Sequence, residues 1–191
     1  MVVPEGAPPA GSPRIFALHK PRKVVVSRVR GRGARTVFEL LPEGQRDWYA
    51  VGRLDQDSEG LLLLCDDPRL AQRLMDPGRV ATSYLVTVRG SLRAKDLDTI
   101  RRGWMASVPR ATSPVEVTRL GNAPRAGTQL QVVLHEGRNL EIHRLLSAAG
   151  LEVRRVIRVG VGPVELADLP ESEGRELAPD EVAALRTLVS Y

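Results

Sequence analysis

Hydrophobic and polar positions divide the chain into short strands and short helices. Apolar or alternating runs predict strands at 14–18, 24–26, 61–65, 83–89, 114–120, 128–134 and 153–159, and an extended segment at 48–54. Helical spacing of apolar residues predicts helices at 69–75, 94–102 and 180–189. Because helices and strands are interleaved and many strand connections are short, we expect an α+β fold with a mixed, largely antiparallel sheet flanked by helices.

One more helix is predicted between Asn139, a favourable N-cap residue, and Gly150, a favourable residue after the last turn. One apolar face is formed by residues at helical spacing, namely Ile142, Leu145, Leu146 and Ala149. Each helical step rotates by about 100°, so His143 flanks this face and Arg144 points away from the core. His143 is therefore placed to reach a half-buried site, although a histidine packed in the core fits the same position.

The first 13 residues are rich in proline, glycine and alanine, which predicts a disordered tail before one domain over residues 14–191. They have no basic start and no apolar core of a signal peptide, and no apolar run reaches the length of a membrane span. Cys65 is the only cysteine, so no intramolecular disulfide can form, and it fits a buried core thiol. We expect a cytoplasmic protein without a membrane partner.

The charge balance moderately favours a nucleic-acid partner. The net charge is +5, and the isoelectric point is about 10.0. Only three of the 28 lysines and arginines are lysines. A guanidinium can bind two phosphate oxygens at once, although an arginine bias also follows from the base composition of a genome.

The densest polar cluster is the segment 52–60, which carries three acids and an arginine between two glycines, next to the buried run 61–65. Charged loops beside a rigid core strand often carry functional sites. A calcium loop is one alternative, because acids and glycine occupy its expected positions at Asp55, Asp57, Glu59, Gly60 and Asp66. That alternative needs an amphipathic helix on each side, and neither flank has that pattern.

The string GRLDQDSEGLLLL, at 52–64, resembles the signature of the RsuA/RluE family of bacterial ribosomal RNA pseudouridine synthases. Further family segments follow in the same order between residues 15 and about 166, as HKPR at 19–22, TVFELL at 36–41, SYLV at 83–86, EGRN at 136–139 and IR at 157–158 before Gly160. Departures are His143, where the family has Arg or Lys, Glu141 for Gln, and Thr82 for Lys. The frequent N-terminal S4 RNA-binding module has no counterpart, as in the RluE-like members.

The resemblance implies a pseudouridine synthase catalytic domain with Asp55 as the nucleophile. Supporting active-site residues would be Arg53, Tyr84, His143 and Ile157. Residues that would bind the RNA backbone are Lys20, Arg22, Arg138, Arg144 and Arg158, together with the basic loop 28–35. Tyr84 would lie against the target base, although an ordinary strand tyrosine fits its position equally.

The implied reaction breaks the N1–C1′ bond of a uridine, turns the base and rejoins it through C5, so it requires a nucleophile but no cofactor and no metal. Attack at C1′ of the ribose and attack at C6 of the base both remain open. We expect a monomer acting on 23S ribosomal RNA, with 16S RNA also open. The alternative from another class is a catalytically weak or inactive RNA-binding or ribosome-assembly protein of the same family.

Overall fold

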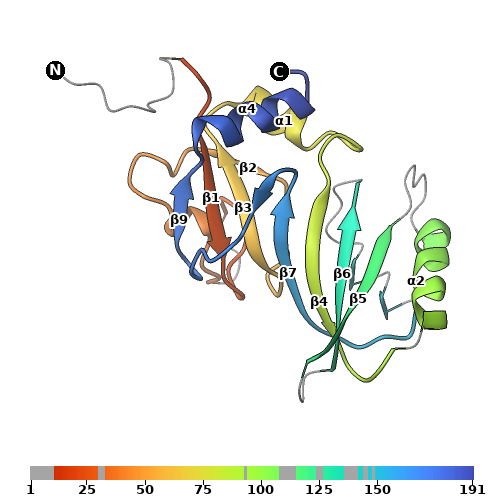
Figure 1. The fold of residues 1–191 in the computed structure, drawn as a ribbon. Helices are drawn as coiled ribbons and strands as arrows, with labels where there is room; N and C mark the ends of the chain where they lie inside the picture. Colours follow the sequence, from red (N-terminus) through yellow and green to blue (C-terminus); the bar gives the residue numbers. More distant parts are fainter. Residues whose placement is uncertain are drawn as a thin grey trace.

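A computed structural model describes residues 11–29, 33–92, 94–107, 115–123, 127–135, 142–143, 146–147 and 149–191. Within these ranges one sheet forms the body of the molecule, with the strand order β5-β6-β4-β7-β3-β1-β9 (Figure 1). Two short strands lie outside this order, where β2 pairs with β3 and β8 pairs with β7. The strands are β1 Ile15–Lys20, β2 Tyr49–Val51, β3 Glu59–Cys65, β4 Thr82–Val88, β5 Glu116–Ala123, β6 Gly127–Leu134, β7 Val153–Val161, β8 Val164–Glu165 and β9 Gly174–Glu176.

The helices are α1 Pro68–Leu74, α2 Ala94–Ser107, α4 Pro179–Leu188 and a short 3₁₀ helix η1 Val37–Glu39. Strand pairs are antiparallel except β3 with β7, which run parallel through Glu59–Gly60 and Ile157–Arg158. The expected α+β fold with a mixed, largely antiparallel sheet is confirmed.

The sheet has a hydrophobic core on each face, because successive strand residues point to opposite sides. Leu61 and Leu63 of β3 face α1 and α4, which pack on one side of the sheet. Leu62 and Leu64 face the opposite side, where η1, α2 and the segment around Ile142 supply the buried partners. Every residue of β3 is therefore buried, as its unbroken apolar run predicts.

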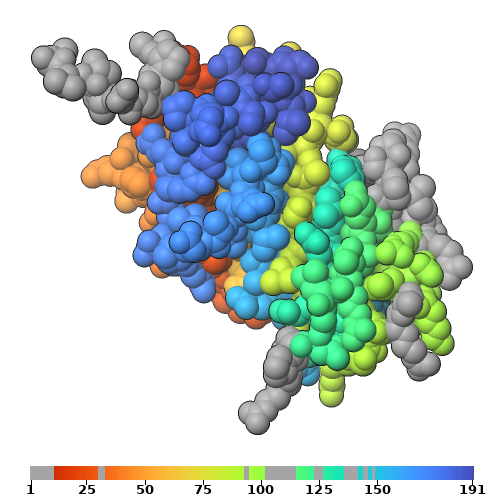
Figure 2. All heavy atoms as spheres, in the orientation of Figure 1, coloured from red at the N-terminus to blue at the C-terminus, as the bar shows by residue number. Residues whose placement is uncertain are grey.

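Most predicted elements are confirmed within a few residues, but the strand at 24–26 is wrong. Val25 forms only an isolated bridge with Thr36, and its N–H donates to Arg35 O at 2.9 Å. β8 and β9 were not predicted, because segments of two and three residues carry no periodicity to detect. In the space-filling view the C-terminal segment lies against the N-terminal strand, and β9 pairs with β1 there (Figure 2).

The predicted helix at 139–150 lies partly outside the described residues, including Asn139 and Leu145. Ile142 and Leu146 are fully buried, as the apolar face requires. Gly150 has φ +76°, Leu151 N–H donates to Leu146 O and Gly150 N–H donates to Ser147 O, both at 2.9 Å. These two bonds and a left-handed glycine form a Schellman motif, so the predicted role of Gly150 after the last turn is confirmed.

Residues 1–10 lie outside the described ranges, so the disordered tail stays a prediction. Cys65 is fully buried, as expected, and burial raises the pKa of its thiol to about 12. None of the helices in the described ranges is long and apolar enough to span a bilayer.

Candidate active site

The segment 52–58 forms a loop between β2 and β3 that places Asp55 beside the end of the sheet. Ser58 N–H donates to Asp55 O at 3.1 Å and closes a turn around the carboxylate residue. Lys23 N–H donates to Gln56 O at 2.7 Å, which fastens the loop to the segment after β1. Within the loop, Leu54 is buried and Asp55 is half-buried. The fold thus holds one carboxylate at a partly screened position on a constrained turn.

Gly60 lets the loop enter β3 against β7. Its φ is +109°, and an added Cβ would lie 2.3 Å from Arg158 O and 2.6 Å from Arg158 N. Side chains are excluded both by this backbone contact and by the left-handed conformation. The glycine therefore allows the parallel pairing of β3 with β7 directly after the Asp55 loop.

Lys20 lies beneath the same loop and is fully buried. Its Nζ donates to Pro21 O at 2.8 Å and to Ser58 O at 2.7 Å. Burial lowers its pKa to about 8, and the charges of Glu59, Asp55 and Asp57 oppose this lowering. The ammonium is thus inaccessible in this structure and its hydrogen bonds hold the loop, which does not support the predicted contact of Lys20 with RNA phosphate.

Asp57 lies on the exposed side of the loop. Lys23 Nζ donates to Asp57 Oδ1 at 2.5 Å, and Arg22 Nη2 lies 4.0 Å from the same oxygen. The Lys23 hydrogen bond is the main cause that lowers the pKa of Asp57, and the charge of His143 also contributes. His143, which is half-buried, therefore lies close enough to this loop to act on it electrostatically.

Glu59 is a buried carboxylate at the start of β3. Arg155 of β7 binds both of its oxygens, with Nε at 2.6 Å and Nη2 at 3.1 Å, and this hydrogen bonding raises the pKa of Arg155. A two-pronged guanidinium bond is geometrically restrictive as well as strong. The pair thus fixes β3 to β7 at the end of the Asp55 loop.

Arg158 is almost fully buried, with 2% of its surface exposed, and Nε donates to Leu61 O at 2.5 Å. This burial does not support the predicted contact of Arg158 with the RNA backbone. Tyr84 is also buried and is the direct cross-strand partner of Arg158 between β4 and β7. Burial lowers the pKa of Arg158, while the charge and hydrogen bonding of Tyr84 oppose that change.

The remaining predicted residues fall into three groups. Arg53 and Arg22 are exposed, so active-site support by Arg53 and RNA binding by Arg22 stay predictions. Ile157 is half-buried and pairs with Glu59 of β3 and Leu85 of β4, next to Arg158. Arg138 and Arg144 lie outside the described residues, so their roles stay predictions.

The basic loop 28–35 is partly structural in the described positions. Arg28 donates to the carbonyl oxygens of Arg46, Asp47 and Trp48, and its guanidinium stacks 4.4 Å from the centre of the Phe38 ring. These contacts engage Arg28 within the protein. Lys23 and Arg155 were not predicted from the sequence, because only the fold brings them beside the loop at 55–59.

The structural requirement of the calcium-loop alternative is not met. A calcium loop of this kind is flanked by helices, but the loop lies between β2 and β3, and β3 separates Asp55 from Asp66. In the described part of the chain, no group of three or more His, Cys, Asp or Glu side chains is placed to hold a metal.

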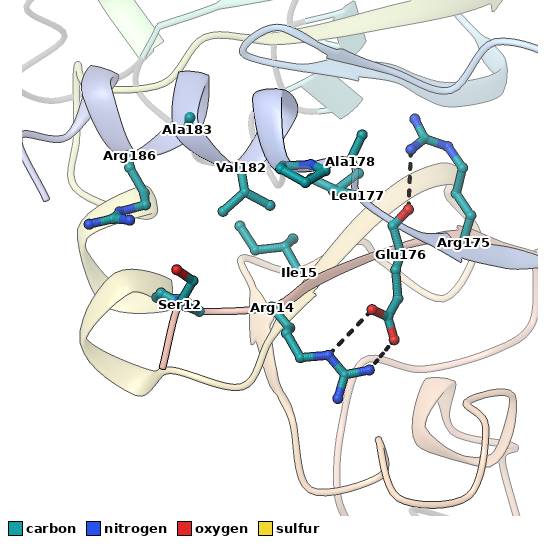
Figure 3. Close-up of a pocket in the computed structure, with 12 residues that line it drawn as sticks. Ser12, Arg14, Ile15, Arg175, Glu176, Leu177, Ala178, Val182, Ala183 and Arg186 are labelled. Atoms are coloured by element: carbon teal, nitrogen blue, oxygen red, sulfur yellow. Dashed lines mark hydrogen bonds and ion pairs between the residues drawn. The ribbon is translucent and has the colours of Figure 1, made fainter. Parts of the chain in front are cut away.

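A hollow of about 490 Å³ lies elsewhere, between β1, β9 and α4 (Figure 3). Its apolar lining includes Ile15, Leu177 and Val182. At its rim Arg14 binds the carboxylate of Glu176. No residue of the loop 52–58 lines it, so we do not assign it to the candidate active site.

Comparisons with known proteins agree with this arrangement. The family model for RNA pseudouridylate synthase matches residues 14–148. A ribosomal large subunit pseudouridine synthase B of Bacillus subtilis is 32% identical over 94% of this chain and 74% of its own length. An uncharacterised RNA pseudouridine synthase of Mycobacterium tuberculosis is 36% identical over 89% of this chain and 68% of its own length. A crystal structure of a pseudouridylate synthase superposes with a TM-score of 0.74 and 25% identity, covering 91% of this chain and 74% of the other.

Proposed function

The chain belongs to the RNA pseudouridylate synthase family, as an isomerase of the RsuA/RluB type, and we propose that it converts a specific uridine of large-subunit ribosomal RNA with Asp55 as the nucleophile. The observation that carries the proposal is the position of Asp55. It is a half-buried carboxylate on a turn closed by Ser58 and held from below by the buried ammonium of Lys20.

The electrostatics of the loop suit a carboxylate nucleophile. Nucleophilic catalysis by Asp requires an ionised side chain held at a fixed position. Asp55 interacts with the charge of Lys20, which lies in the protein interior, where charges are less screened than in bulk water. Hydrogen bonds at Gln56 and Ser58 restrain the backbone directly after Asp55, which favours the fixed geometry that a reacting group requires.

The substrate class rests on the named relatives and on charge. The Bacillus subtilis relative is named as a large-subunit enzyme. Arg22 and Arg53 are exposed near the Asp55 loop and can contact phosphates. We propose no metal and no cofactor, because isomerisation needs neither a redox change nor a Lewis acid. A monomeric state and a cytoplasmic location stay predictions.

Mapping pseudouridine in ribosomal RNA tests the proposal. Cells that lack the gene should lose one large-subunit pseudouridine, and the wild-type gene should restore it. Asp55→Asn should not restore it, although the nearly isosteric variant folds and binds RNA. Asp66→Asn is the matched control at the opposite end of β3, where the amide oxygen can still accept the Arg14 N–H.

Four results would decide against the proposal or a part of it. An unchanged pseudouridine map would contradict the substrate, and a lost small-subunit modification would move it to 16S RNA. Full restoration by Asp55→Asn, with deamidation excluded by mass spectrometry, would contradict the nucleophile. An RNA complex without turnover on any ribosomal fragment would favour the alternative of an inactive RNA-binding relative. The observation that motivates this alternative is His143, where the family has Arg or Lys.

A further inference from the structure

Arg158 occupies a gap in the strand pairing beside the nucleophile loop. β3 pairs with β7 only at Glu59 and Gly60, and it pairs with β2 from Leu63 onward. Leu61 lies between these two ladders, and Arg158 Nε donates to its carbonyl oxygen. The guanidinium therefore takes the place of a backbone donor at the point where β3 changes partners.

The same side chain lies against Tyr84. Arg158 and Tyr84 are paired directly across β7 and β4, so their side chains stand on the same face of the sheet. The register shifts between Ser83 and Tyr84, which marks a bulge at this position. Bulges re-aim a side chain out of the regular ladder. The charge and hydrogen-bonding effect of Tyr84 on Arg158 indicates that its hydroxyl lies near the guanidinium.

The positive charge of Arg158 is buried and has no negative partner among the described residues. Within the described residues, Nη2 is buried without a hydrogen-bond partner, and no carboxylate forms an ion pair with Arg158. Glu59, the acid of β3, is instead bound by Arg155. Burying a cation without a carboxylate is costly, and an apolar side chain of similar size would avoid that cost. Stability alone therefore gives a weak reason for a guanidinium here.

We propose that Arg158 is a positioning residue for the isomerisation, which holds the Tyr84 hydroxyl at a fixed place relative to β3 and the nucleophile loop. The inference rests on the proposed function and on the expectation, implied by the family resemblance, that Tyr84 lies against the target base. An arginine has five donors and no acceptor, so the phenolic oxygen accepts in this contact. The guanidinium, which is bonded at Nε to Leu61 O, thus links β3, the strand that follows Asp55, to Tyr84.

A positioning role and a phosphate-binding role of Arg158 predict different effects on kcat and KM. The side chain is buried, so its loss leaves the basic surface intact and should leave KM and the salt dependence of RNA binding unchanged. A displacement of about 1 Å in a reacting group can reduce a rate by about 100-fold. The expected effect of Arg158→Lys is therefore a fall in kcat of about tenfold to 100-fold.

A double-mutant cycle with Tyr84→Phe tests the connection. Arg158→Lys keeps the charge but has no second arm, and Tyr84→Phe keeps the ring but has no hydroxyl. If Arg158 acts through the hydroxyl, Arg158→Lys costs less than about twofold in kcat once the hydroxyl is absent, because coupled residues are not additive. Arg155→Lys is the control on the same strand. It weakens another β3–β7 contact and should reduce kcat by the same factor in both backgrounds.

Melting temperatures of all variants show which species are folded under the assay conditions. If Arg158→Lys is unfolded, Arg158→Gln replaces it, because the amide keeps one donor for Leu61 O. Equal effects of the Arg158 variant with and without the Tyr84→Phe substitution would overturn the inference, and so would wild-type kcat in Arg158→Lys or a raised KM at constant kcat. Full turnover by Asp55→Asn would instead overturn the proposed nucleophile, and a wild type without turnover would overturn both.

Discussion

Lys20→Met should abolish a rise in stability that the wild-type protein shows at alkaline pH, where the buried Lys20 amine loses its proton. The pKa of Lys20 is lowered by burial from 10.5 to about 8 in the folded chain. Between these pH values the unfolded chain holds a proton that the folded chain has lost, so unfolding takes up a proton. The free energy of unfolding therefore rises with pH across this window.

The magnitude follows from the two pKa values. One pH unit corresponds to about 1.4 kcal/mol, so the window from about 8 to 10.5 gives a gain of about 3 kcal/mol. Methionine has no titrating group but has similar length. It also leaves the Pro21 and Ser58 carbonyl oxygens without their donor, which costs about 1–3 kcal/mol for each buried group. The stability advantage of wild type over Lys20→Met should thus widen by about 3 kcal/mol toward pH 10.5.

Urea unfolding at closely spaced pH values measures this difference, with the fluorescence of buried Trp48 as a probe. Leu18→Val is the matched control, because it changes the core on the same strand and adds no titrating group. Its stability difference from wild type should stay constant with pH. A Lys20→Met difference that is also constant, or that narrows with pH, would refute the reasoning about the buried ammonium.

Four further outcomes are expected. Gly60→Ala should destabilise the fold by about 3 kcal/mol, because its Cβ meets the Arg158 backbone at positive φ, and a melting temperature equal to wild type would contradict this. His143→Ala should reduce turnover without lowering the melting temperature, and the reverse pattern would make it a core histidine. Turnover should persist in EDTA, whereas loss and rescue by calcium would revive the calcium loop. RNA affinity should fall with salt, with a log–log slope of about −0.7 to −0.9 per phosphate contact, and a flat plot would contradict a phosphate-binding surface.

Local patterns in the sequence determined most of the elements and the location of the candidate site. The unbroken run at 61–65 predicted a strand buried on both faces, and β3 is one. Gly150 predicted the end of a helix, and its left-handed conformation provides it. The loop at 52–60 carries its own signature, so Asp55 could be singled out before any fold was known. These features depend on neighbouring residues, whose spacing is visible along the chain.

Only the tertiary structure decided which basic residues are buried. Lys20 and Arg158 look like phosphate ligands in the sequence, because charge gives no sign of depth. The strand order places β1 and β7 on either side of β3, and both side chains are buried there. The same order brings Arg155 to Glu59, 96 positions apart. Long-range pairing sets such contacts, and hydrophobic periodicity does not encode a partner, so sequence alone identified the loop but not the residues that hold it.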